Sequence, residues 1–194
     1  MSSYLSVDLD YFYDFKTLDK CLDQLGKPVD NIDFTKDHHV LLPRIQKSGA
    51  RHVINLDTHD DLNLDFKKDN VLHCGNWASY ALDKKHIDTY SWYHGDHAVE
   101  CNFHGGFHAV ERHFGKKIER HASPFIPDAK TSLMGVGLCL SPDYIAINRH
   151  MVVDRVLHWC LKNEISINNK NPRDIIADKY FLKDITKKGK EISL

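Results

Sequence analysis

Short apolar runs alternate along this chain with longer stretches in which apolar residues recur every three or four positions. The short runs predict buried strands over residues 4–9, 52–56, 87–93 and 133–140. The longer stretches predict helices over residues 15–25, 40–45, 76–82 and 148–162. Alternating strands and helices are typical of an α/β domain whose central sheet is mostly parallel, and we predict that fold class.

Two regions depart from this alternation. Residues 96–129 carry five histidines and the pair Gly105-Gly106 without a sustained period, so we expect a long loop or irregular excursion near the sheet edge. A separate zinc site on His104 and His108 is a minor alternative there, because the glycine pair interrupts any helix. We expect one domain at residues 1–163, followed by a tail at residues 164–194. The tail is lysine-rich and contains an amphipathic stretch, so it could be a lid, an oligomer contact or a loosely packed end.

Charge and cysteine content exclude several classes of partner. With 26 Lys and Arg against 27 Asp and Glu, the composition indicates no surface for nucleic acid or an anionic membrane. Five scattered cysteines without a Cys-x-x-Cys pair argue against a disulfide framework or a structural zinc site. No apolar run approaches the roughly 18 to 20 residues that a membrane-spanning helix needs. We therefore expect a soluble, cytoplasmic protein.

Two acidic motifs stand where predicted strands end. Asp8 and Asp10 close the first apolar run, and Asp57, His59 and Asp61 follow the second. Side chains alternate faces along a strand, so each motif is expected to present its residues on one face. In parallel sheets, ligands bind beyond the carboxyl ends of the strands, where both motifs lie. Clustered carboxylates repel one another unless a cation compensates them, and oxygen ligands with some nitrogen suit manganese, so we predict a site for two metal ions.

Two further histidines precede predicted helices. His38 follows Asp37 just before the helix at residues 40–45, a pattern that alone is an ordinary N-terminal cap. His73 lies just before the helix at residues 76–82. Because an imidazole titrates near neutral pH, His73 is a candidate for proton transfer, beside its alternative as a structural histidine.

Together these motifs resemble the arginase or ureohydrolase superfamily, which combines Asp-His, Asp-x-His-x-Asp, a later histidine and an Asp-x-Asp strand. In arginases the Asp-x-Asp strand comes last, whereas here it opens the chain, so the sequence resembles a circular permutation of the metal core. The segments Asp-His-His-Val-Leu-Leu-Pro, Gly-Asn-Trp and Gly-Leu-Cys-Leu-Ser-Pro-Asp-Tyr are most similar to the small arginase-like proteins that include the peptide arginases. Those maturases convert arginine side chains of ribosomal precursor peptides into ornithine. The resemblance covers roughly residues 4–162.

The resemblance implies a three-layer α/β fold and a centre of two Mn(II) ions. The ligands of one ion would be His38, Asp57, Asp61 and Asp8. Those of the other would be His59, Asp57, Asp8 and Asp10, so that Asp57 and Asp8 bridge. Two cations about 3.5 to 4 Å apart activate water for attack on a guanidinium carbon. His73 would be the catalytic proton shuttle, and urea and ornithine would be the products.

The chain departs from arginases at the carboxylate that binds the guanidinium. Arginases use a glutamate after the Asp-x-Asp strand, and this sequence has no glutamate before Glu100. Asp143, which follows the last apolar strand, is the first candidate for this catalytic role, and Glu100 and Asp60 come after it. Such a carboxylate is needed if a cationic guanidinium is to be desolvated.

Substrate contacts are predicted at Asn63, Asn76 and Trp77. Asn63 matches a position at which arginases contact the free amino acid, which keeps free arginine or agmatine open as substrates. However, the chain is much shorter than the free-arginine enzymes, and Trp77 with the aromatic run at residues 90–93 could line a groove for an extended peptide. We therefore predict that the substrate is an arginine-containing precursor peptide.

Three other functions stay open. A calcineurin-like phosphoesterase also has Asp-x-His and Gly-Asn segments, but it would leave Asp8 and Asp10 unexplained. A zinc deacetylase of the same fold keeps one metal and would leave His38 and Asp10 without a role. A non-catalytic, metal-stabilised binding protein is compatible with the sequence, because the guanidinium carboxylate is missing from its expected place.

Overall fold

The structure is a computed structural model of the chain. It describes residues 2–95, 99, 106–122, 132–141 and 147–168. Among them no helix is long and apolar enough to cross a membrane.

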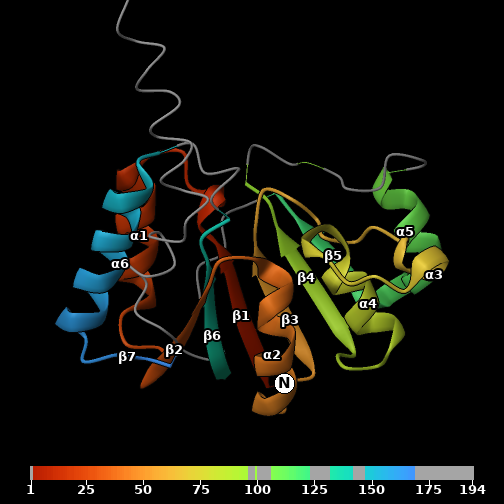
Figure 1. Cartoon of the computed structure of the whole chain (residues 1–194), viewed down its shortest axis with the longest axis horizontal. Coiled ribbons are helices and arrows are strands. Elements are labelled where there is room, and N and C mark those ends of the chain that lie inside the picture. Colours follow the sequence, from red (N-terminus) through yellow and green to blue (C-terminus); the bar gives the residue numbers. More distant parts are fainter. Residues whose placement is uncertain (1, 96–98, 100–105, 123–131, 142–146, 169–194) are drawn as a thin grey trace, which may run out of the picture.

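Parallel strands form the central sheet of the molecule (Figure 1). Its seven strands are β1 (Ser3–Asp8), β2 (Asn31–Thr35), β3 (His52–Leu56), β4 (Thr89–Tyr93), β5 (Ile118–His121), β6 (Leu133–Cys139) and β7 (Ser166–Ile167). They lie in the order β5-β4-β3-β1-β6-β2-β7, and each neighbouring pair is parallel. This arrangement confirms the predicted α/β class.

Helices cover both faces of the sheet. Their bounds are α1 (Phe15–Leu25), α2 (Leu42–Ser48), α3 (Phe66–Asp69), α4 (Trp77–Asp83), α5 (Gly106–Phe114) and α6 (Arg149–Lys162). Short 3-10 turns are η1 (Leu9–Tyr11), η2 (His38–Leu41), η3 (Cys74–Asn76) and η4 (Gly115–Lys117). Figure 1 shows α1 and α6 on one side of the sheet and the other helices on the opposite side, so the domain has three layers.

The two sheet faces bury separate apolar clusters, as the alternation of side chains requires. Leu5 and Val7 of β1 pack with the α1 and α6 layer, whereas Tyr4 of the same strand packs with α2 and α4. Tyr4 needs room on its face, because a Cβ at Gly135 would lie 2.6 Å from Tyr4 Cε2. A Cβ at Gly137 would lie 2.7 Å from Leu41 Cδ2, so these glycines let Leu41 of η2 and Tyr4 approach β6.

The expectation of a loop at residues 96–129 is wrong for the described part of that region. α5, η4 and β5 lie within it. Phe107, Val110 and Phe114 are buried and recur at helical spacing, and Ile118 anchors β5 in the same cluster. The interspersed histidines and glycines hid this stripe in the sequence.

Two strands at the other sheet edge were not predicted either. β2 has only Ile32 and Phe34 as its buried apolar pair, which is too short a run to stand out from its polar neighbours. β7 pairs with β2 through Ser166 and Ile167, so the sheet continues into the segment predicted as a tail. The rest of that segment, from residue 169, lies outside the described residues.

Candidate metal centre

Four neighbouring strands end together and place the candidate site. The chain leaves β1 through α1 to β2 and returns through α2 to β3 on the other side of β1. Such a switch in direction opens a crevice at the carboxyl ends of parallel strands. Asp8 ends β1, Asp57 follows β3, His38 follows β2 in η2, and Cys139 ends β6.

Tight turns, rather than strand alternation, orient the two acidic motifs. Asp8 Oδ1 accepts a hydrogen bond from the backbone N–H of Asp10 at 3.0 Å, which closes η1 directly after the strand. Asp57 Oδ1 accepts one from the backbone N–H of His59 at 2.8 Å. Further on, Asp61 has a φ of 53°, in the left-handed region. The predicted convergence is confirmed, but it arises from Asp-centred turns that carboxylates favour.

One group of ligand atoms surrounds His38. Its Nδ1 lies 2.9 Å from Asp57 Oδ2 and 3.1 Å from Asp61 Oδ2. The same nitrogen lies 3.4 Å from Asp8 Oδ2, and His38 Nε2 lies 3.0 Å from Ser6 Oγ. All of these side chains are buried. An imidazole and three carboxylates thus converge in a dry environment, where unpaired charge is costly.

A second group lies on the other side of Asp57. His59 Nδ1 is 3.2 Å from Asp10 Oδ2 and 3.6 Å from Asp57 Oδ1. Asp57 therefore turns one oxygen toward each histidine, as a bridging ligand would. Asp10 is only 3 % exposed, yet neither of its carboxylate oxygens accepts a hydrogen bond from the described chain. Its contact with His59 is within ion-pair distance but lacks hydrogen-bond geometry.

These groups meet the distance requirement for holding a metal ion. The ligand atoms lie within 4.8 Å of one another in each of the sets Asp8–His38–Cys139, Asp10–Asp57–His59 and His38–Asp57–Asp61. All six predicted ligands occur in these sets. Buried carboxylates and imidazoles at such spacing, including an unsatisfied Asp10, fit a divalent cation.

The pKa values of the aspartates reflect this crowding. Burial raises the pKa of Asp8 and Asp61 well above the ordinary value, and the charge of Asp57 adds to the shift. Burial likewise raises the pKa of Asp10. For Asp57, burial is outweighed by His38 and His59, which hold the pKa of that carboxyl below its usual range. The negative charge of the group therefore concentrates on the central carboxylate.

The neighbouring carboxylates raise the pKa of both histidines. Burial alone would lower the pKa of His59, but Asp10 and Asp57 raise it to about 11. Burial is outweighed at His38 as well, where Cys139, Asp8 and Asp57 raise the pKa well above its ordinary value. Without a cation, protons on the imidazoles balance the carboxylates, and metal binding would have to displace those protons.

A set of donors around the ligands holds their orientation. Trp77 Nε1 donates to Asp61 Oδ2 at 2.5 Å, and Asn55 Nδ2 donates to Asp57 Oδ2 at 3.2 Å. Ser141 Oγ donates to Asp8 Oδ2. Sequence analysis missed Asn55, Ser141 and Cys139 as members of the site. The one available signal was an amide inside the apolar run 53–56.

The predicted aromatic groove is wrong for its aromatic residues other than Tyr93, which is half-buried. Trp77, Tyr90 and Trp92 are 0 % exposed and belong to the core between the sheet and α4. Trp77, which was predicted to bind substrate, instead supports Asp61 from behind. Trp92 Nε1 donates to the backbone carbonyl of Asp57 at 2.9 Å, so this side chain also faces inward.

His73 lies at the start of η3 with its side chain 39 % exposed. Its Nε2 lies 3.0 Å from Asp65 Oδ2, and its Nδ1 accepts from the backbone N–H of Gly75 at 3.2 Å. Asn76 Nδ2 donates to Asp65 Oδ1 at 2.8 Å. Both ring nitrogens of His73 are engaged, and the fully buried Asn76 braces the same turn.

Four further residues were predicted to belong to the site, namely Asn63, Asp60, Asp143 and Glu100. Asn63 is half-buried, and its Oδ1 accepts from the backbone N–H of Asp65 at 3.1 Å. Asp60 is fully buried, with Oδ1 accepting from the backbone N–H of Leu62 at 3.1 Å. Asp143 and Glu100 lie outside the described residues, so the guanidinium carboxylate stays a prediction.

The minor zinc alternative gains no support among the described histidines. His108 is exposed and lies 3.0 Å from Glu111 Oε2, and His113 lies 2.8 Å from Lys67 Nζ. Neither belongs to a group with metal-ligand spacing in the described chain. His104 lies outside the described residues.

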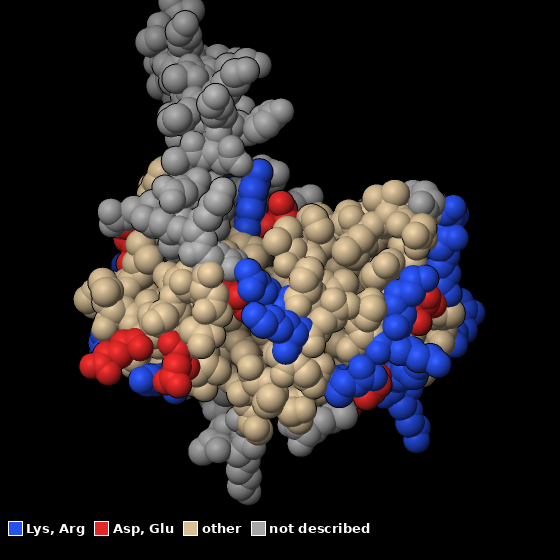
Figure 2. Space-filling view, turned by 60° about the horizontal axis from the view of Figure 1, so that its bottom comes forward, with Lys and Arg blue, Asp and Glu red and all other residues tan. Residues whose placement is uncertain are grey.

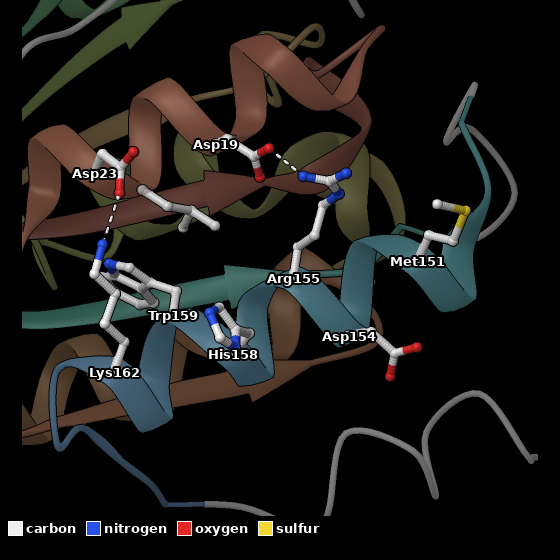
Figure 3. Close-up of a pocket in the computed structure, with 9 residues that line it drawn as sticks. Asp19, Asp23, Met151, Asp154, Arg155, His158, Trp159 and Lys162 are labelled. Carbon is white, nitrogen blue, oxygen red and sulfur yellow. Dashed lines mark hydrogen bonds and ion pairs between the residues drawn. The ribbon is translucent and has the colours of Figure 1, made fainter.

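A surface pocket lies between α1 and α6, and none of the six predicted metal ligands lines it (Figure 3). Arg155 is paired with Asp19 across it, and Lys162 Nζ lies 3.4 Å from Asp23 Oδ1. Figure 2 shows that basic side chains gather at the α3–α5 end of one face and acidic ones at the other end, so neither sign covers that face. Because no residue that lines the pocket belongs to a group with metal-ligand spacing among the described residues, we assign the chemistry to the buried cluster.

Comparison with known proteins identifies no relative. No protein-family model, no curated protein and no solved structure matches the chain. The site is therefore interpreted from its own geometry.

Proposed function

We propose that the protein is a hydrolase of the arginase type that uses two Mn(II) ions to convert arginine side chains of a precursor peptide into ornithine, releasing urea. The arrangement around Asp57 carries the proposal. Each oxygen of this carboxylate faces a different histidine, and each histidine faces a further aspartate. A carboxylate shared between two histidine groups could hold two adjacent cations, as in two-metal hydrolases.

The proposed ligand sets build on the two groups in the structure and share Asp8 as a second bridging ligand, as the resemblance to arginases implies. One position takes His38, Asp61, Asp57 and Asp8, and the other takes His59, Asp10, Asp57 and Asp8. Bound divalent cations supply Lewis-acid activation of water for attack on a guanidinium carbon. Trp77 and Asn55 donate to Asp61 and Asp57, and such outer partners keep a ligand oriented.

His73 is proposed to carry the proton that the departing ornithine amine requires. Asp65 lies 3.0 Å from Nε2 and orients the ring, so the histidine is held in one pose. Its partly exposed side chain can exchange a proton with solvent. Asp143, with Glu100 and Asp60 as alternatives, is proposed to bind the guanidinium.

The unequal exposure of the proposed ligands supports a substrate that reaches the centre with a side chain. Among the six proposed ligands, His59 has the most exposed side chain, at 23 %, while that of His38 is 1 % exposed. A substrate that approached from the His59 side would insert the extended end of an arginine side chain and leave the remaining peptide outside. Free arginine and agmatine share that end and are the alternative substrates.

Urea release tests the proposal directly. The protein, freed of metal and then supplied with Mn²⁺, is incubated in parallel with an arginine-containing peptide, free arginine and agmatine. We expect urea with manganese only, and the Asp57→Ala variant should release none. Asp33→Ala is the control, since Asp33 is a buried aspartate on β2 that belongs to neither ligand set. Metal-loaded protein that releases no urea from any of the three would support a non-catalytic role, and one tightly held zinc in a protein that binds no second divalent ion would favour the deacetylase alternative.

A further inference from the structure

Cys139 is a buried thiol that sequence analysis did not connect with the site. It ends β6, and the parallel register places it beside Asp8, the last residue of β1. Its side chain is fully buried. Cys139 Sγ donates to the backbone carbonyl of Lys36 at 3.2 Å and lies 3.2 Å from Ser141 Oγ. The thiol therefore points toward the strand ends rather than into an apolar cluster.

The thiol also has metal-ligand spacing. Cys139 Sγ, a carboxylate oxygen of Asp8 and a ring nitrogen of His38 all lie within 4.8 Å of one another. On the other side of Asp57, the set Asp10–Asp57–His59 contains oxygen and nitrogen atoms alone. The two proposed positions thus differ in the type of ligand atom, because only the His38 side has a sulfur.

Ligand softness governs which divalent ion a site selects. Thiolates favour zinc and softer ions, whereas carboxylates and water favour manganese. We propose that Cys139 is an additional metal ligand on the His38 side, so that this position binds a thiophilic ion such as Zn²⁺ more tightly than the His59 side does, while both positions accept Mn²⁺. This inference rests on the proposed metal centre and adds the selectivity of its two positions. On coordination the thiol loses its proton to solvent, and sulfur is not oxidised.

Cadmium is the probe, because a thiolate bound to Cd²⁺ gives an ultraviolet charge-transfer band that oxygen and nitrogen ligands do not give. Metal-free protein is titrated with Cd²⁺ as wild type, Cys139→Ser and Cys74→Ser. Cys74 is the matched control, as it is an exposed free cysteine outside the three ligand sets. We expect the band in wild type and Cys74→Ser and its loss in Cys139→Ser. Zn²⁺ affinity should fall at least about tenfold in Cys139→Ser, with Mn²⁺ affinity much less affected.

The outcomes separate this inference from the proposed function. A wild-type protein that binds Mn²⁺ through Asp57 but shows no cadmium band overturns the role of Cys139 and leaves the manganese centre standing. A band that survives in Cys139→Ser also overturns it. Protein that binds none of the three ions refutes both proposals. If Cys139→Ser does not fold, Cys139→Ala, which adds no polar group to the buried position, takes its place.

Discussion

Replacing Asp8 by asparagine should stabilise the metal-free protein while abolishing its response to manganese. Asp8 is 3 % exposed, and burial together with Asp57 and Asp10 raises its pKa well above the ordinary value, although His38 offsets part of the shift. The folded protein therefore carries a cost when this carboxyl is ionised. Asparagine keeps the shape without the charge, can accept from the Asp10 N–H and can donate to the Ser141 hydroxyl.

The size of the effect follows from the burial of one incompletely compensated polar group, which costs about 1–3 kcal/mol. We expect the free energy of unfolding of metal-free Asp8→Asn to exceed that of wild type by about this amount at pH 7. The pH dependence of this cost follows from the raised pKa, because Asp8 keeps its proton to a higher pH in the folded state than in the unfolded state. The cost therefore grows as pH rises above the unfolded-state pKa of Asp8, about 3.9, and vanishes below that pH.

With excess Mn²⁺, wild type should have a larger free energy of unfolding than Asp8→Asn. At a free concentration of 100 times Kd, a cation that binds the folded state alone stabilises it by about 2.7 kcal/mol, and Asp8→Asn should lack this gain. Denaturant unfolding with chelator and with excess Mn²⁺, at pH 5 and pH 7.5, measures both effects.

Asp33→Asn is the control for this experiment. Asp33 is buried and accepts from Tyr4 Oη at 3.0 Å, away from the cluster. It should keep the full response to manganese. The reasoning is refuted if Asp8→Asn is less stable than wild type without metal at pH 7.5 and gains as much from Mn²⁺.

Three further predictions concern other residues. His73→Ala should keep manganese and the fold but slow urea release by roughly 10² to 10⁴, the range for a lost general acid or base; an unchanged rate would make the residue structural. Trp77→Phe removes the donor to Asp61 and should weaken Mn²⁺ binding by about 10- to 100-fold in calorimetric titration; unchanged affinity would contradict the role given to that bond. Gly137→Ala places a Cβ 2.7 Å from Leu41 Cδ2 and should lower the free energy of unfolding by about 1–3 kcal/mol in denaturant; a neutral result would mean that the Leu41 side chain can shift.

Much of the fold could be predicted from local patterns. β1, β3, β4 and β6 were expected close to their observed bounds, as were α1 and α6, because burial on both faces makes these strands continuous apolar runs. α5 was missed for a local reason, since its three apolar anchors stand among histidines and glycines. β7 is too short for any periodicity to mark it.

The ligand types and their approximate meeting place were already determined by the sequence. Asp8, Asp57 and His38 follow apolar strands or precede a helix, and parallel strands bring such positions to one edge. Motif spacing contains that information because each motif is local.

Only the tertiary structure decided which other side chains join them. Cys139 lies beside Asp8 because β1 and β6 pair in a particular register, and no local pattern encodes a register between strands so far apart in the chain. Trp77 was expected at the surface for a substrate, but the packing of α4 against the sheet buries it, and its indole N–H instead finds Asp61. A buried donor must find a partner, and which partner depends on packing between distant elements.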